Sequence, residues 1–197
     1  MEMKDNSGIL LFIVNVFAAS KKAGKLWGQA NSILISKGIP YHCRMTGVEG
    51  NAHDLTREAC AAGYRKFIAV GGDGTVHDVL NGIMDHVIGT SADLSEYALG
   101  VIPIGSGNDW IKSLGISKVF SKAIDVIAAG KTGKQDVVKV SLMDRSALPD
   151  KKVVGTSYMA NVGGVGLDAR VCDRVNSKKT QGKRGKMLYV SALMYNI

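Results

Sequence analysis

Val70-Gly71-Gly72-Asp73-Gly74-Thr75-Val76 joins a short apolar run to a segment with helical spacing, and this stretch decides the fold. The apolar run over 66–70 predicts a buried strand, and 75–86 predicts a helix. The three glycines let the backbone turn sharply and approach a ligand closely. The N–H groups and the dipole of a helix start attract an anion, most often a phosphate. The stretch therefore predicts a strand, a phosphate-binding loop and a helix.

Asp73 is the anomaly in this loop, because a carboxylate repels a phosphate group. The carboxylate makes sense if it orients a metal ion, a bound water molecule or a hydroxyl group. Loop and carboxylate together suggest a nucleotide-phosphate site built for phosphoryl transfer, which depends on positioning and charge neutralisation. A purely structural role for Asp73 in the turn stays open.

A second motif, Leu99 to Trp110 (L-G-V-I-P-I-G-S-G-N-D-W), repeats the layout of strand, glycine turn and helix start. Either Asn108 or Asp109 can cap the helix that follows. The carboxyl ends of parallel strands meet at one edge of a sheet, where ligands bind. We therefore expect Asp73 and Asp109 to meet across one cleft.

The two motifs together resemble the diacylglycerol kinase catalytic domain family, which includes bacterial lipid kinases and sphingosine and ceramide kinases. The GGDGT loop (71–75) is shared with NAD kinases, whereas P-I-G-S-G-N-D (103–109) separates lipid kinases from them. Further similarities are Asn15, Thr46 and the segment Asn161 to Asp168. The resemblance covers about residues 9 to 195.

The resemblance implies an α/β fold of the NAD kinase/diacylglycerol kinase type. Its N-terminal domain has a parallel sheet with helices on both faces, and part of an antiparallel β domain follows. The alternation of apolar runs and amphipathic segments indicates the same layout. Strands are predicted at 9–14, 41–45, 66–70 and 98–102, helices at 22–37, 51–62 and 75–86 with one or two more over 108–129, and a loop at 86–97. Because 136–143 and 152–160 alternate like exposed-face strands, we place the domains at 1–130 and 131–197.

The resemblance also implies the residues of the site. Asp73 and Asp109 would be the catalytic residues and would hold Mg²⁺, directly or through water; Mg²⁺ commonly uses one or two carboxylates and keeps several waters. The implied nucleotide-binding residues are Asn15, Thr46, Gly71, Gly72, Asp73, Gly74, Thr75, Asp78, Gly105 and Ser106. The implied reaction is transfer of the γ-phosphoryl group of ATP to the hydroxyl group of diacylglycerol or a similar lipid.

Two departures from the family leave alternatives open. The loop Asn15-Val16-Phe17-Ala18-Ala19 lacks the proline and glycine of the family's Asn-Pro-x-Ser-Gly turn, so phosphate binding by this loop is in question. The family's general-base glutamate lies beyond the last residue, which suggests a C-terminally truncated chain. An NAD kinase-type enzyme and a catalytically incomplete nucleotide-binding fragment remain alternatives. Unpaired edges of a partial β domain predict self-association.

Composition agrees with this interpretation. A formal charge of +8 favours an anionic partner such as a nucleotide, an acidic membrane surface or a nucleic acid, and the resemblance implies the first two and no nucleic acid. The three cysteines have no CxxC spacing, which indicates reduced thiols in a cytoplasmic protein. No apolar stretch reaches about 18 residues, and the polar N-terminus does not fit a secretion signal. We therefore expect a cytoplasmic protein of phospholipid metabolism, peripheral to the membrane.

Overall fold

The computed structural model describes residues 5–18, 23–47, 49–104, 107–144, 146, 152–164 and 166–180. Backbone contacts divide the chain into two compact units, Met1–Ala160 and Asn161–Ile197. The first unit contains a four-stranded parallel sheet of order β2-β1-β3-β4. Its strands are β1 (Leu10–Val14), β2 (Tyr41–Met45), β3 (Lys66–Gly71) and β4 (Ala98–Pro103). The predicted α/β class and all four predicted parallel strands are confirmed.

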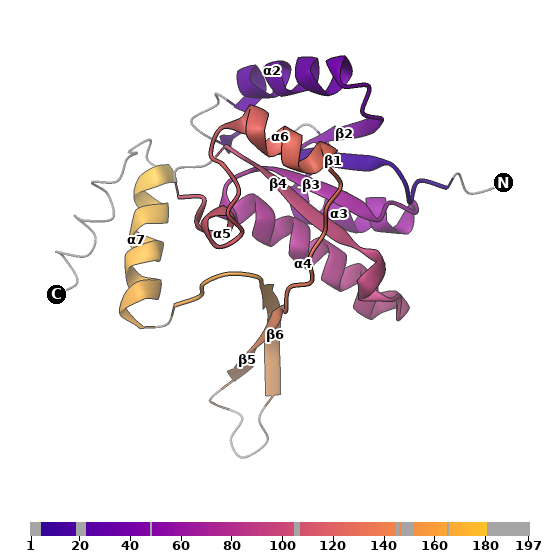
Figure 1. Ribbon diagram of the computed structural model, residues 1–197. Coiled ribbons are helices and arrows are strands. Elements are labelled where there is room, and N and C mark those ends of the chain that lie inside the picture. Colours follow the sequence, from indigo (N-terminus) through magenta and orange to yellow (C-terminus); the bar gives the residue numbers. More distant parts are fainter. Residues whose placement is uncertain are drawn as a thin grey trace. The chain divides into compact units, whose positions relative to one another are not determined.

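Helices cover both faces of this sheet (Figure 1). Helices α2 (Ala23–Ser36) and α6 (Phe120–Ala128) pack on one face, and α3 (Ala52–Ala61) and α4 (Asp73–Thr90) pack on the other. Alternate side chains of β1 separate the two cores, since Leu11 packs toward α3 and α4 while Phe12 packs toward α2. Burial on both faces is the physical reason why β1 and β3 are continuous apolar runs.

The predicted helix boundaries hold where a capping residue sets them. The Asn51 side chain accepts a hydrogen bond from the Asp54 N–H and caps α3. Gly38 and Gly63 have φ of +63° and +88° and follow the ends of α2 and α3, as glycines commonly do. The predicted helix over 75–86 is too short at both ends, since α4 begins at Asp73, within the GGDGT motif. Instead of ending at 86, α4 runs to Thr90 because Val87 is buried in the core, and the short helix η1 (Leu94–Glu96) lies in the predicted loop.

A separate two-stranded antiparallel sheet completes the first unit, as the sequence predicts. It pairs β5 (Val138–Asp144) with β6 (Lys152–Met159). The side chain of Gln135, just before β5, accepts a hydrogen bond from the Trp110 indole N–H and donates one to the Ala160 carbonyl after β6. The predicted domain boundary near residue 130 stays a prediction.

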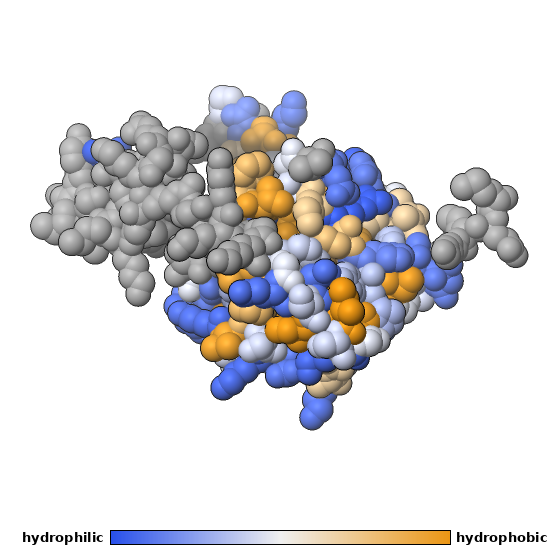
Figure 2. All heavy atoms as spheres, turned by 90° about the horizontal axis from the view of Figure 1, so that it is seen from above, coloured by the Kyte–Doolittle hydropathy of each residue, from blue (hydrophilic) through white to orange (hydrophobic). Residues whose placement is uncertain are grey.

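The second unit contains α7 (Leu167–Thr180), which follows the glycine-rich segment that begins at Asn161. Within it Val175 is fully buried and packs against Val171. In the part of the chain that the structure describes, no helix is both long and apolar enough to cross a membrane. Figure 2 shows apolar side chains in small groups between hydrophilic ones rather than as one broad apolar surface on the visible face.

Candidate functional site

The carboxyl ends of the four parallel strands bring the predicted site residues to one edge of the sheet. Asn15 follows β1, and Thr46 follows β2. The GGDGT motif runs from Gly71, the last residue of β3, into the first turn of α4. The backbone ladder continues into these ends, since the Thr46 N–H donates to the Val14 carbonyl at 2.9 Å. The Ile104 N–H donates to the Gly71 carbonyl at 2.8 Å and joins the two glycine motifs directly. Gly105 and Ser106 lie outside the described residues.

Asp73 connects the two motifs through its side chain. Its two carboxylate oxygens accept hydrogen bonds from the backbone N–H groups of Asp109 and Trp110, each at 3.1 Å. These N–H groups begin the short helix α5 (Asp109–Ser113). The expectation that Asn108 or Asp109 caps this helix is therefore wrong. The Asn108 side chain makes no capping hydrogen bond, and the cap comes from a residue 36 positions away.

The carboxylates of Asp73 and Asp109 both lie close to Gly107. A Cβ atom built on Gly107 would stand 3.1 Å from an oxygen of Asp73 and 3.4 Å from an oxygen of Asp109. The other oxygen of Asp109 is paired with the Lys112 ammonium group one turn later on α5. The two carboxylates therefore come together around one backbone position, as the sequence analysis expects, with a cation beside one of them.

Thr75 and Asn15 form a second connection across the same edge. The Asn15 amide donates to the Thr75 hydroxyl at 3.0 Å, and Thr75 is almost fully buried. The Thr75 side chain packs directly on Gly71, where an added Cβ would stand 2.2 Å from its hydroxyl oxygen. Gly71 is thus required by contact with a neighbouring side chain.

Replacing Gly71 by alanine is expected to destabilise the protein by about 1–3 kcal/mol, the usual cost of overpacking a tight site. The added methyl group would push Thr75 away from Asn15, and thermal unfolding measures the loss. Gly74→Ala is the matched control for stability, because nothing lies within 4 Å of its Cβ position. Alanine there is expected to leave the melting temperature unchanged or slightly higher, because it favours a helix over glycine. Equal melting temperatures for Gly71→Ala and wild type would contradict this packing argument.

The start of α4 offers backbone donors to an anion, although fewer than the sequence analysis assigns. The Thr75 and Val76 N–H groups both donate to the Gly72 carbonyl, so the Thr75 N–H is already engaged. Gly74 is exposed and has open space at its Cβ position, so a ligand can approach its backbone. The dipole of an 18-residue helix adds positive potential at this end.

Asp78 lies one turn into α4 and is half-buried. Burial raises the pKa of its carboxyl above 3.8, and the nearby His77 and His53 partly offset the increase. A raised pKa means that the folded protein binds this proton more tightly than the unfolded chain does. The ionised Asp78 therefore lowers stability at neutral pH, and this penalty disappears as the pH falls below the unfolded value.

Asp78→Asn is expected to raise the melting temperature at pH 7, with a smaller increase as the pH approaches 3.8. Asp144→Asn should have the opposite sign at pH 7, because hydrogen bonds from Ser146 lower the pKa of Asp144 and its ionised form is favoured in the fold. Calorimetric unfolding between pH 4 and pH 7 measures both variants. A melting temperature of Asp78→Asn that is unchanged or lower at pH 7 would count against the burial argument.

Asn81 is a site neighbour that the sequence analysis missed. Its side chain donates to the Tyr158 carbonyl at 3.0 Å and accepts from the Tyr158 N–H at 2.8 Å, so one amide satisfies both backbone groups of a buried residue in β6. It also donates to the His77 carbonyl on its own helix. The available signal was a polar residue within the apolar run Val79 to Ile83. Asn81 therefore connects β6 by hydrogen bonds to α4, the helix that begins in the GGDGT motif.

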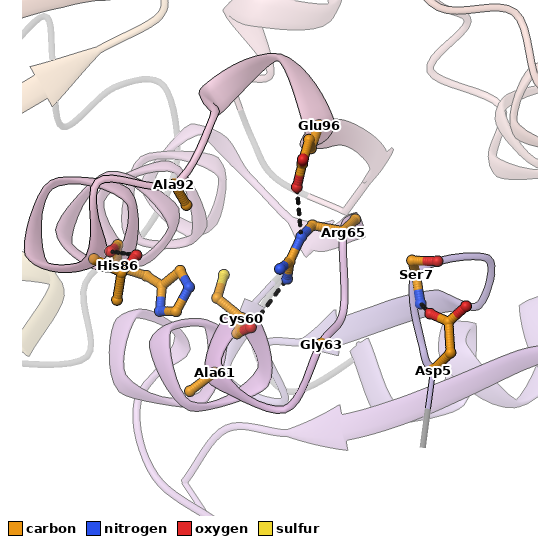
Figure 3. Close-up of a pocket in the computed structure, with 10 residues that line it drawn as sticks. Asp5, Ser7, Cys60, Ala61, Gly63, Arg65, His86, Ala92 and Glu96 are labelled. Atoms are coloured by element: carbon orange, nitrogen blue, oxygen red, sulfur yellow. Dashed lines mark hydrogen bonds and ion pairs between the residues drawn. The ribbon is translucent and has the colours of Figure 1, made fainter. Parts of the chain in front are cut away.

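An open depression of about 780 Å³ lies at the opposite, amino-terminal edge of the sheet. Figure 3 shows Arg65 held within it by the Glu96 carboxylate and the Cys60 carbonyl. Arg65 also stacks on the Tyr97 ring, and the Cys60 thiol is buried, which raises its pKa to about 12. Arg65 and Glu96 in this depression are paired with each other, and ligands of open α/β sheets bind at the other edge. It is therefore not the candidate site.

The donor set at the carboxyl edge fits a hydrated metal ion rather than a protein-enclosed one. Among the described residues, no group of three or more His, Cys, Asp or Glu side chains is placed to hold a metal. Asp73 and Asp109 supply two carboxylates around Gly107. This is the number of protein ligands that Mg²⁺ commonly uses when it is shared with substrate phosphates.

Comparison with known proteins places these features in a family context. The family model of the diacylglycerol kinase catalytic domain matches residues 9–140. The protein "Probable lipid kinase YegS-like" of Enterobacter sp. (strain 638) is 32% identical over 123 residues, which are 61% of this chain and 39% of that protein. "Probable lipid kinase YegS" of Salmonella heidelberg (strain SL476) is 33% identical over 113 residues, 57% of this chain and 36% of that protein. The chain thus spans less than half the length of these relatives.

A solved structure shares the fold. A diacylglycerol kinase from Bacillus anthracis str. Sterne aligns with a TM-score of 0.53 at 24% sequence identity, and the alignment covers 69% of this chain and 47% of that chain. At this identity the likeness concerns the fold alone.

Proposed function

Since this chain belongs to the diacylglycerol kinase catalytic domain family, we propose that it transfers the γ-phosphoryl group of ATP to the hydroxyl group of diacylglycerol or a similar lipid. The single observation that carries the proposal is the position of Asp73. Asp73 belongs to the GGDGT motif, and its carboxylate caps the helix of the second motif. The same carboxylate lies near that of Asp109, beside Gly107. These contacts support a single site, built from both motifs, at the carboxyl edge of the sheet.

Each group has a role that its chemistry supports. The exposed backbone at Gly74 and the start of α4 would bind phosphate oxygens. Asp73 and Asp109 would hold Mg²⁺ beside the transferring group, directly or through water. A magnesium ion there would neutralise charge that develops on the phosphoryl oxygens. Lys112, beside Asp109, adds a cation near the same position.

A lipid acceptor requires the protein to work at a membrane surface. The formal charge of +8 favours binding to anionic lipids, at about 1 kcal/mol for each basic residue near the surface. We therefore propose a peripheral membrane enzyme of phospholipid metabolism. This attraction is electrostatic, so binding to anionic vesicles should weaken as salt is added.

The test is transfer of radiolabelled γ-phosphate from ATP with Mg²⁺ to mixed micelles that contain diacylglycerol, with NAD as a parallel acceptor. Label in the lipid fraction supports the proposal. Label in NAD alone would replace it with an NAD kinase-type activity. Binding of ATP by calorimetry without label in either acceptor would identify a nucleotide-binding chain that does not catalyse transfer.

A further inference from the structure

Phe17 is an exposed aromatic side chain at the ligand-binding edge of the sheet. It lies in the loop after β1, and 60% of its surface is exposed. Part of the ring packs on Gly47, after β2, where an added Cβ would stand 2.4 Å from a ring carbon. Gly47 also has φ of +82°, which other residues rarely adopt. Glycine at this position therefore makes room for the ring, and most of the ring remains open to a ligand.

Hydrogen bonds fix the backbone of Phe17 relative to the GGDGT loop. Its N–H donates to the side-chain oxygen of Asn15 at 3.0 Å, and the amide of the same side chain donates to Thr75 at 3.0 Å. The Ala18 N–H donates to the Asn15 carbonyl and closes the turn. The loop lacks the family's proline and glycine, yet Asn15 holds Phe17 and the phosphate loop together.

Thr46 is the second unusual group at this place. Thr46 directly precedes Gly47, and only 6% of its surface is exposed to solvent. Within the part of the chain that the structure describes, its hydroxyl oxygen has no hydrogen-bond partner. A buried hydroxyl without a partner costs free energy, and a ligand that supplies the partner recovers it. This hydroxyl belongs to the residue directly before Gly47, the glycine on which the Phe17 ring packs.

We infer that Phe17 is the surface on which the base of the bound nucleotide stacks. The inference rests on the proposed function and adds the base-binding part of the same site. Strand spacing of about 4.8 Å puts the ends of β3 and β2 about 10 Å apart. A nucleotide whose phosphates lie at the GGDGT loop spans this distance to its base. On the opposite side of the GGDGT motif, toward β4, lie the Asp73 and Asp109 carboxylates, which would hold the metal beside the transferring phosphoryl group.

The experiment compares the binding of Mg²⁺–ATP with that of tripolyphosphate, which has no base, by calorimetry. The variants are Phe17→Ala, Phe17→Leu and Phe17→Tyr, with Ile35→Ala as a control for loss of an exposed apolar side chain on α2, and melting temperatures confirm folding. Aromatic–base stacking predicts that the Ala and Leu variants bind ATP about tenfold more weakly and bind tripolyphosphate as wild type does. Phe17→Tyr and Ile35→Ala should bind both ligands like wild type.

Leucine keeps apolar contact with Gly47 but has no π face. Phe17→Leu therefore removes base stacking while it keeps the packing on Gly47. Wild-type ATP affinity in Phe17→Leu overturns the inference, and so does an equal loss of ATP and tripolyphosphate. If wild type binds neither ligand, the inference and the proposed function both fail. If ATP binding depends on Phe17 but no acceptor is phosphorylated, the base site stands and the proposed transfer does not.

Discussion

Asp109→Asn and Asp73→Asn are each expected to lower phosphoryl transfer at least about a hundredfold, the usual effect of removing one group that stabilises charge in a transition state. Their effects on stability should differ. The Asp73 carboxylate caps α5 through two N–H groups, and asparagine retains only one acceptor oxygen. Asp73→Asn should therefore also cost about 1–2 kcal/mol of folding free energy. The Asp109 side chain pairs with Lys112, and both groups are exposed, so Asp109→Asn should leave stability nearly unchanged.

The measurement combines the radiolabel assay with urea unfolding of each variant. Asp125→Asn is the matched control, because Asp125 is an exposed carboxylate on α6 that is paired with Lys37 away from the loops. This control should keep both activity and stability. Wild-type transfer by Asp109→Asn would remove Asp109 from the proposed metal site. A fully stable but inactive Asp73→Asn would show that the cap contributes little to folding.

Asn81→Asp is expected to give the largest loss of stability among the substitutions of α4. A carboxylate cannot donate to the Tyr158 carbonyl, and its charge would repel that oxygen and the His77 carbonyl. Each buried backbone group left without a partner costs about 1–3 kcal/mol. The expected decrease in the free energy of unfolding is therefore at least about 2 kcal/mol.

Urea unfolding and hydrogen exchange at the Tyr158 amide measure this effect. The amide donates to the Asn81 oxygen, and a carboxylate can still accept from it, so its exchange should accelerate because repulsion at the Tyr158 carbonyl separates β6 from α4. Thr90→Ala, an exposed change on the same helix, should stay within about 0.5 kcal/mol of wild type. Unchanged protection of the Tyr158 amide in Asn81→Asp would show that α4 does not hold β6 through this residue.

The sequence by itself determined the sheet and its ligand-binding edge. Strands buried on both faces leave a local signal, because runs such as Phe67 to Val70 contain almost nothing polar. The caps at Asn51 and Gly63 are local as well, since each depends on residues within one turn of the helix end. Because each of them comes at the carboxyl end of a predicted parallel strand, Asn15, Thr46 and the GGDGT motif lie at the predicted edge of the sheet.

The tertiary structure decided what these residues contact. Asp73 caps a helix that begins 36 residues later, and Asn81 bonds a backbone 77 residues away, so no local pattern shows either pairing. The extension of α4 to Thr90 depends on burial of Val87 against distant residues. The space that Gly47 leaves for Phe17 exists only because β1 and β2 lie side by side. Composition and spacing fix which groups reach the site, whereas packing between distant segments fixes which of them are engaged and which remain open to a ligand.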